Sequence, residues 1–268
     1  MPIKSVNSNL CLTQQGPVAV IEISDPKNEN RLSKEILRGI ISVCGELRSS
    51  EEIHVVIVRG SGNRYFSLGI LTPQLKYDLG KHGVLELVEL GNRACDAVEN
   101  LPQIVIGALN GEARAGAVEL ALACDLRVAA AHVRLSLPEA QWGCFPGAGA
   151  PVRLPFLVGP SRALEVIVLA DILDAKELQM LGVINRVFES EIFDQSLMAY
   201  AEKIASRGPQ ALRGAKAVIR SRIEPGFSAA RRLSDALRHT FEFTPDADEG
   251  VLAHMQGRSP KFSGRSAG

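Results

Sequence analysis

Long apolar runs, paired cysteines and an excess of one charge are all missing from this sequence of 268 residues. No segment reaches about 18 apolar residues without a charge, and the N-terminus lacks the apolar run of a signal peptide. Thirty basic and thirty acidic residues balance to zero net charge, so no overall field attracts the protein to nucleic acid or to an anionic membrane. We therefore expect a cytoplasmic protein that binds neither.

The cysteines exclude two further classes of protein. There are five, an odd number, and they are widely spaced without a CxxC pair or a nearby histidine cluster. Zinc sites and disulfide frameworks are typically built from such pairs. The sequence thus predicts reduced, mostly buried thiols and no metal site. Hydrophobic residues make up 46% of the chain, enough for a substantial core.

What is present is an alternation of short apolar runs and amphipathic stretches. Leu10–Leu12 and Val18–Ile23 flank the turn signal QQGP and predict a hairpin. Apolar residues at helical spacing follow Ser33 as far as Leu47, which predicts a capped helix. The continuous run IHVVIVRG predicts a strand buried on both faces by helices.

The alternation continues with a helix over 83–99, a strand over 103–109 and a helix that begins near Arg114. This order is typical of an α/β fold with a parallel sheet. From about residue 160 the pattern is mainly helical, with one strand at 183–188. We expect a core over residues 1–200 and a helical region over 201–268.

Glu119 is the unusual residue of the central segment, NGEARAGAVELALACD. It would lie in the second turn of its helix, among small and apolar neighbours that leave no broad polar face. A carboxyl in such surroundings either is buried with an ion-pair partner or lines a cleft. Its residue neighbours alone leave both readings open.

A second carboxyl, Glu139, follows Pro138 at a predicted strand exit, twenty residues after Glu119. Two carboxyls that face one cavity can hold a water between them and divide acid and base roles. Gly116 would place a backbone N–H at the helix start, where it can stabilise an oxyanion or simply allow close packing. A second candidate donor is the N–H of Leu68, in RYFSLGIL.

Taken in order, these segments resemble the crotonase superfamily, which comprises the enoyl-CoA hydratases and isomerases. The matching segments are DPKNENRLS, YFSLGI, NGEARAGAVELALACD, LPEAQWGCFPGAGA and FTPDADEGVLAHMQGRSPKF. The resemblance implies an α/β fold, a spiral of repeated ββα units. It also implies a C-terminal helical region that mediates assembly into a homotrimer or a dimer of trimers.

The resemblance further implies an acyl-CoA thioester substrate, with no cofactor beyond the coenzyme A that the substrate carries. Glu119 and Glu139 fall on the two carboxyls of the hydratases, where Glu119 activates water and Glu139 gives a proton to the α-carbon. Leu68 and Gly116 fall on the two N–H donors of the oxyanion hole. The other residues that the resemblance assigns to substrate or CoA binding are Lys27, Ser67, Gly69, Ile70, Trp142, Pro146, Gly147 and Lys261.

The first donor segment departs from the family pattern, which usually reads small-Gly-small-Asp. Leu68, Ile70 and Leu71 are bulkier here. Lys27 and Lys261 contact the CoA or are ordinary surface charges, and Trp142 lines the acyl pocket or anchors the core. We expect an enoyl-CoA hydratase. The alternatives are another enzyme of the superfamily (an isomerase, decarboxylase or thioesterase) or a non-catalytic CoA-binding member.

Overall fold

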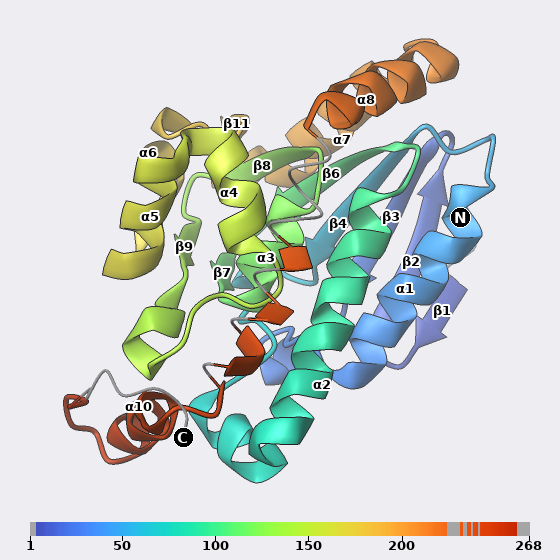
Figure 1. Ribbon diagram of the computed structural model, residues 1–268. Coiled ribbons are helices and arrows are strands. Elements are labelled where there is room, and N and C mark those ends of the chain that lie inside the picture. The colour runs from blue at the N-terminus through green and yellow to red at the C-terminus, as the bar shows by residue number, and fades with distance from the viewer. Residues whose placement is uncertain (1–3, 224–230, 233–234, 237, 241, 262–268) are drawn as a thin grey trace.

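The computed structural model describes residues 4–223, 231–232, 235–236, 238–240 and 242–261. Its strands form two sheets, which helices flank (Figure 1). The larger sheet has seven strands in the order β1-β2-β3-β4-β6-β8-β11, and the smaller has four in the order β10-β9-β7-β5. The strands are β1 (Lys4–Asn7), β2 (Leu10–Gln15), β3 (Val18–Ile23), β4 (Val55–Gly60), β5 (Tyr65–Ser67), β6 (Ile104–Leu109), β7 (Glu112–Arg114), β8 (Leu126–Ala130), β9 (Arg134–Ser136), β10 (Leu173–Asp174) and β11 (Arg186–Phe188).

The centre of the larger sheet is parallel, as predicted, from β3 through β4, β6 and β8 to β11. The predicted hairpin is confirmed in β2 and β3, which pair antiparallel across a turn at Gly16. β4 is almost wholly buried, as its continuous apolar run predicted. Apart from the strand that ends before Pro138, the residue pattern alone did not predict the smaller sheet, because its three- and two-residue strands carry no clear period of their own.

The chain repeats one unit of two strands and a helical segment. β4 and β5 precede α2, β6 and β7 precede α3, and β8 and β9 precede the short helix η2. In each unit the first strand joins the larger sheet and the second joins the smaller one. Parallel strands need such crossover connections. The ββα spiral that the resemblance implied is therefore confirmed.

Ser33 and Thr72 cap the two long helices that lie side by side over the larger sheet in Figure 1, α1 and α2. The Ser33 side chain accepts a hydrogen bond from the N–H of Ile36, so the predicted helix and its cap are confirmed. α2 begins ten residues earlier than predicted, and Gly80, at φ 62°, interrupts it. The helices are η1 (Pro26–Asn28), α1 (Lys34–Arg48), α2 (Pro73–Glu99), α3 (Gly116–Leu122), η2 (Pro138–Trp142), α4 (Ala150–Val158), α5 (Pro160–Leu169), α6 (Ala175–Met180), η3 (Ser190–Ile192), α7 (Phe193–Ala205), α8 (Pro209–Ile223) and α10 (Pro245–Met255).

The C-terminal part folds back over the core, where α10 packs against α2 and η2. Gly250 of α10 lies directly on the backbone of Trp142, so a side chain at this position would collide with η2. The helical region predicted over 201–268 falls partly outside the described residues.

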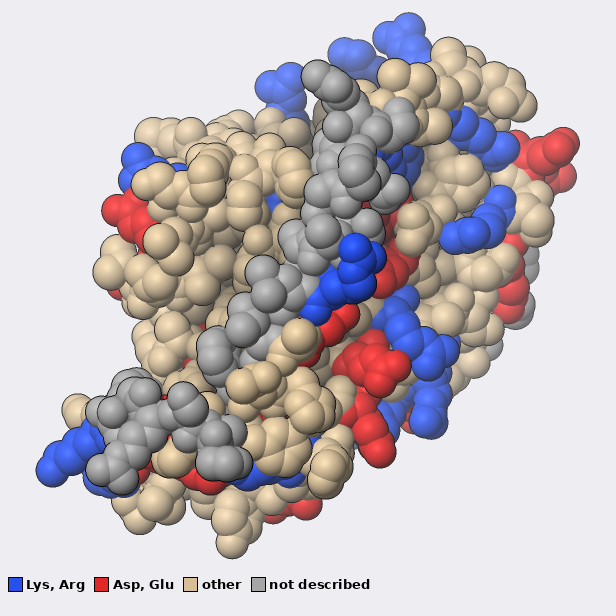
Figure 2. Space-filling model, viewed as in Figure 1, with Lys and Arg blue, Asp and Glu red and all other residues tan. Residues whose placement is uncertain are grey.

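None of the helices in the described part of the chain is both long and apolar enough to cross a membrane. The five cysteines are free thiols, three of them buried, as predicted. On the face shown in Figure 2, Lys and Arg side chains lie among Asp and Glu side chains over α1 and α2.

Candidate active site

A small cavity brings Glu119 and Glu139 together. Glu119 reaches it from α3 and Glu139 from η2, and the loop before α4 closes one side. The cavity has a volume of about 30 Å³, room for about two waters. The predicted meeting of the two carboxyls is thus found in the structure, and it depends on three segments that follow one another in the chain.

Glu119 is held by backbone N–H groups, with only 2% of its surface exposed. Its Oε1 accepts hydrogen bonds from the N–H of Ala148 at 2.8 Å and of Ala150 at 2.9 Å. Gly149, at φ 118°, gives the loop the left-handed turn that directs both N–H groups to one oxygen. Burial raises the pKa of Glu119, while these N–H groups and the charge of Arg153 act to lower it.

No cation of the described residues lies within ion-pair distance of Glu119. Of the two alternatives for Glu119, burial with an ion-pair partner and a place lining a cleft, the structure supports the second. Glu119 is a hydrogen-bonded carboxyl at a cavity wall, and α4 begins where its oxygen accepts the two N–H groups.

Glu139 has the opposite environment. It is 8% exposed, and its Oε2 has no hydrogen-bond partner among the described residues. Burial, followed by the negative charge of Glu119, raises the pKa of Glu139 to about 8, against smaller opposing effects of Arg238 and Arg114. Near neutral pH the Glu139 carboxyl consequently retains its proton, and it can donate that proton into the cavity.

Ile70 and Gly116, each with one backbone N–H group, also line the cavity. Neither N–H has an acceptor among the described residues. The two segments are in direct contact, because a Cβ on Gly116 would lie 2.7 Å from Cγ1 of Ile70 and a Cβ on Gly69 would lie 3.2 Å from the Gly116 nitrogen. A side chain at position 116 would thus collide with the cavity wall.

The prediction of Leu68 as an oxyanion donor is wrong in this structure. Its N–H donates to the carbonyl oxygen of Glu29 at 3.1 Å and is therefore occupied. Ile70, two residues later and beyond the turn at Gly69 (φ 84°), has a backbone N–H without an acceptor among the described residues. The sequence-based prediction thus named the residue before Gly69, whereas the N–H without an acceptor belongs to the residue after it.

Trp142 and Gly147 line the cavity as predicted. Trp142 also meets the His254 ring edge-on, with centroids 6.2 Å apart, so it contacts α10 as well as the cavity. A Cβ on Gly147 would lie 2.9 Å from Cδ of Arg238, which explains the need for glycine there.

Ser67 and Gly69 shape the turn that leads to the donor segment. The Ser67 hydroxyl accepts a hydrogen bond from the N–H of Gly69 at 3.1 Å, and a Cβ on Gly69 would lie 2.6 Å from the carbonyl oxygen of Arg114. Neither of the two lines the cavity, and neither does Pro146, although Pro146 is buried beside it. Their predicted contacts with substrate stay predictions.

The two predicted CoA-binding lysines are distant from the cavity lining. Lys27 is exposed on η1 and Lys261 is exposed after α10, and neither lines the cavity. The backbone N–H of Lys261 donates to Glu249. The structure therefore does not bring them to the carboxyls, and contact with the distal part of a CoA stays a prediction for both.

Three charged side chains beside the cavity were missed. Lys76 of α2, Arg238 and Glu242 are 5%, 3% and 4% exposed. Arg238 forms a short ion pair with Glu242, and Nζ of Lys76 lies 3.6 Å from the same Glu242 oxygen. Only the spacing of Arg238 and Glu242, four residues apart, was a signal in the sequence, since i,i+4 pairs meet on a helix face.

Arg153 supports the loop that holds Glu119. Its guanidinium lies 2.6 Å from Glu99 and 2.9 Å from Asp96, and it donates to the carbonyl oxygen of Ala148 at 3.1 Å. The loop is thus fixed to the end of α2. In the described part of the chain no group of three His, Cys, Asp or Glu side chains is placed to hold a metal.

Comparison with known proteins identifies the family of the chain. The family model described as enoyl-CoA hydratase/isomerase matches residues 13–265. The chain belongs to the enoyl-CoA hydratase/isomerase family. The resemblance to the crotonase superfamily is thereby confirmed, and the match spans both the spiral core and the C-terminal helices.

Individual relatives match this chain over nearly the whole length of both proteins. The crotonyl-CoA hydratase of Syntrophomonas wolfei is 31% identical over 255 residues, which cover 95% of this chain and 97% of that protein. A crystal structure of an enoyl-CoA hydratase from Bacillus anthracis has a TM-score of 0.78 at 30% identity, covering 96% and 100% of the two chains. The 2,3-dehydroadipyl-CoA hydratase of Escherichia coli is 29% identical over 259 residues, or 96% of this chain and all of that protein.

Proposed function

We propose that this family member is an enoyl-CoA hydratase, which adds water to a 2-enoyl-CoA to give a 3-hydroxyacyl-CoA. The observation that carries the proposal is the pair of unlike carboxyls, Glu119 and Glu139, on one cavity wall beside two N–H groups without an acceptor. The names of the relatives, several of them hydratases, support it. The coenzyme A is part of the substrate, and the chemistry needs no other cofactor.

The reaction places one task on each group. The N–H groups of Ile70 and Gly116 hold the thioester oxygen, which gains negative charge as the enolate forms. Glu119, stabilised as a carboxylate by two N–H groups, takes a proton from water as the water oxygen bonds to the β-carbon. Glu139 gives its proton to the α-carbon when the enolate collapses. The carboxyls then exchange their extra proton to restore the resting state.

The protonation states support this division of roles. Glu139, whose pKa is raised to about 8, carries a proton at neutral pH and suits the acid. A double-bond isomerisation can be carried out by a single carboxyl that removes and returns a proton. The second carboxyl at the same cavity therefore favours hydration over isomerisation.

The test is to follow the absorbance of the conjugated enoyl thioester with the purified protein and with crotonyl-CoA or longer 2-enoyl-CoAs. Hydration lowers this absorbance and adds the mass of one water to the product. Glu139→Gln should abolish turnover, whereas Glu86→Gln, on the exposed face of α2, should not.

Three other outcomes separate the rivals. Unchanged product mass indicates isomerisation, loss of carbon dioxide indicates decarboxylation, and release of free CoA indicates a thioesterase. Binding of the thioesters without any turnover indicates a non-catalytic member, in which the bulk of Ile70 and Leu71 keeps the cavity closed. Any of these results overturns the hydratase proposal.

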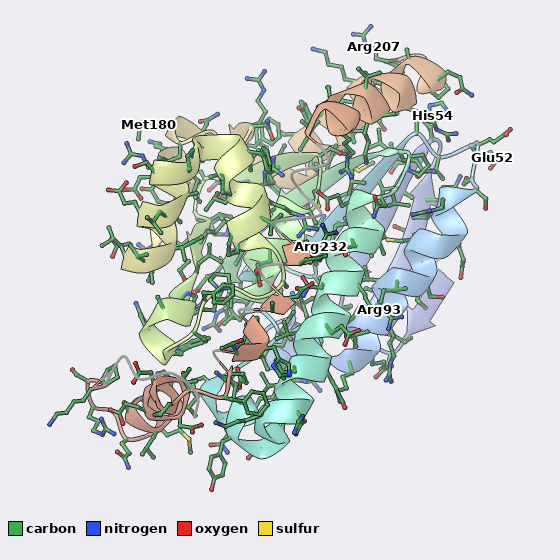
Figure 3. All side chains as sticks on the ribbon, viewed as in Figure 1. Glu52, His54, Arg93, Met180, Arg207 and Arg232 are labelled. Atoms are coloured by element: carbon green, nitrogen blue, oxygen red, sulfur yellow. The ribbon has the colours of Figure 1, made fainter. Side chains whose placement is uncertain are left out.

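A homotrimer or a dimer of trimers is proposed as the assembly. Apolar side chains exposed on and beside α5 and α6 support it, because large exposed apolar patches typically mark protein interfaces. Met180, labelled in Figure 3, is 81% exposed. Light scattering of the purified protein measures the mass directly, and a monomer would contradict this assembly. The other exposed residues of this face are Leu164, Val168, Leu169 and Ile172.

A further inference from the structure

Two buried cations face the cavity that holds the reacting carboxyls. Lys76 and Arg238, which we name the cationic wall, both line it and are 5% and 3% exposed. The acid paired with them is Glu242, itself 4% exposed. The two positive charges therefore have one acid within ion-pair distance, Glu242, while the other charged carboxyl of the cavity, Glu119, is held by the N–H groups of Ala148 and Ala150.

The donors of the cationic wall exceed the acceptors around it. A guanidinium has five N–H donors and an ammonium has three. Among the described residues Arg238 donates to Glu242, and Lys76 has the Glu242 oxygen at 3.6 Å and the sulfur of Cys144 at 3.8 Å. Glu139, the next carboxyl on this side of the cavity, keeps its proton near neutral pH. A buried charge without a full partner is costly, so the wall favours the arrival of an anion.

The place of Lys76 and Arg238 in the cavity lining determines which part of a substrate would contact them. The cavity also contains Glu119, Glu139 and the N–H groups of Ile70 and Gly116, which define where the reacting end of an acyl thioester lies. An anion in the same small cavity belongs to the acyl group, because the CoA extends from the other side of the thioester. Because the two cations and the two carboxyls line one cavity, the acyl chain between the thioester and this anion is short.

We infer that Lys76 and Arg238 bind a carboxylate at the far end of a short acyl group, so that the substrate is the CoA thioester of an unsaturated dicarboxylic acid. This inference rests on the proposed function. The planar guanidinium of Arg238 can pair with a carboxylate through two parallel hydrogen bonds. Glu242 occupies one partner position in the empty site, and the substrate carboxylate supplies the second negative charge.

The experiment compares two enoyl thioesters of equal chain length, one ending in a carboxylate and one in a methyl group. Glutaconyl-CoA and 2-pentenoyl-CoA are the matched pair, and the methyl ester of glutaconyl-CoA controls for size. A hydrogen bond to a charged group is worth about 1.5–3 kcal/mol, so kcat/KM for glutaconyl-CoA should exceed that for 2-pentenoyl-CoA by roughly 10- to 100-fold. The methyl ester should behave like 2-pentenoyl-CoA.

Variants assign this preference to the wall. Arg238→Met and Lys76→Met should each bring the ratio of the two kcat/KM values close to one, and Arg238→Lys should keep part of it. Glu242→Gln leaves both cations without their internal partner and should increase the ratio. Arg93→Met on α2 and Arg232→Met in the C-terminal segment, both exposed and labelled in Figure 3, are matched controls that should leave the ratio unchanged.

The outcomes keep this inference separate from the proposed function. If the protein hydrates 2-pentenoyl-CoA as well as it hydrates glutaconyl-CoA, the hydratase proposal stands and the carboxylate inference is wrong. If Arg238→Met and Lys76→Met slow both substrates equally, the wall only positions Glu139, and the inference is again wrong. If neither thioester is hydrated, the hydratase proposal itself fails. Should one Met variant fail to fold, the opposite change expected from Glu242→Gln still decides the matter.

Discussion

Replacing Glu139 by glutamine should change how the stability of the protein depends on pH. Burial and the charge of Glu119 raise the pKa of Glu139 from its ordinary 4.5 to about 8. In the unfolded chain the carboxyl has lost its proton above about pH 5, whereas in the folded chain it keeps the proton up to about pH 8. The folded state thus binds one proton more than the unfolded state in this window.

The sign follows from proton linkage. Because the unfolded state binds fewer protons, the free energy of unfolding falls as pH rises. The stability that the neutral carboxyl provides is complete below pH 4.5 and is lost as pH rises to about 8. Each pKa unit corresponds to about 1.36 kcal/mol, so the whole loss is roughly 5 kcal/mol. Glutamine does not titrate. The Glu119 carboxyl, whose pKa burial raises, is present in both proteins and contributes to both slopes.

Urea unfolding at pH 5, 6, 7 and 8 measures this effect. The free energy of unfolding of the natural protein should fall by up to about 1.4 kcal/mol per pH unit more steeply than that of Glu139→Gln. A buried amide with a missing partner lowers the stability of the variant by the same amount at every pH, so it does not alter the slope. Glu86→Gln, at an exposed carboxyl, should keep the natural slope. Parallel pH curves for the natural protein and Glu139→Gln would refute the assignment of a shared proton to this cavity.

Three further substitutions test the rest of the site. Glu119→Gln keeps an oxygen that can accept the N–H groups of Ala148 and Ala150, so it should leave the melting temperature nearly unchanged while it lowers kcat by roughly 10²- to 10⁴-fold in the absorbance assay. Gly116→Ala places a methyl group 2.7 Å from the Ile70 side chain, and it should cost about 1–3 kcal/mol in urea unfolding and reduce kcat; full activity would show that the contact is unimportant. Arg153→Met leaves Glu99 without its buried partner and should cost about 3–5 kcal/mol, so an unchanged unfolding midpoint would contradict the support it gives to the Glu119 loop.

The parts of the fold that could be predicted from sequence are those with a local cause. The helix after Ser33 has a cap and a regular apolar stripe, and β4 has a continuous apolar run, so both were predicted close to their actual bounds. The start of α2 was missed although Thr72 and Pro73 form an ordinary cap and first turn, because the break at Gly80 divided the pattern. Most of the smaller sheet could not be read from the residue pattern, because its strands are too short for a period, and only the resemblance implied it.

The residues of the site that could be predicted are likewise those with a local signal in the sequence. Glu119 could be found because it is a carboxyl among small and apolar neighbours, and Glu139 because it follows Pro138 at a predicted strand exit. Both signals are local. Leu68 and Ile70 could not be separated, because the choice depends on a hydrogen bond to Glu29 from a distant segment. Lys76 and Arg238 meet only in the folded chain, and nothing in the residues around either one indicates the other.

The two sides of the cavity come from segments that are far apart in the chain, and this affects how the site can evolve. Glu119 and Glu139 come from one continuous stretch of the spiral, whereas Lys76 lies in α2 and Arg238 and Glu242 lie near the C-terminal helix. Substitutions in the C-terminal segment can therefore alter the cationic wall while the segment that carries Glu119 and Glu139 stays the same. With the roles proposed above, substrate choice and reaction type can be inherited separately within this fold.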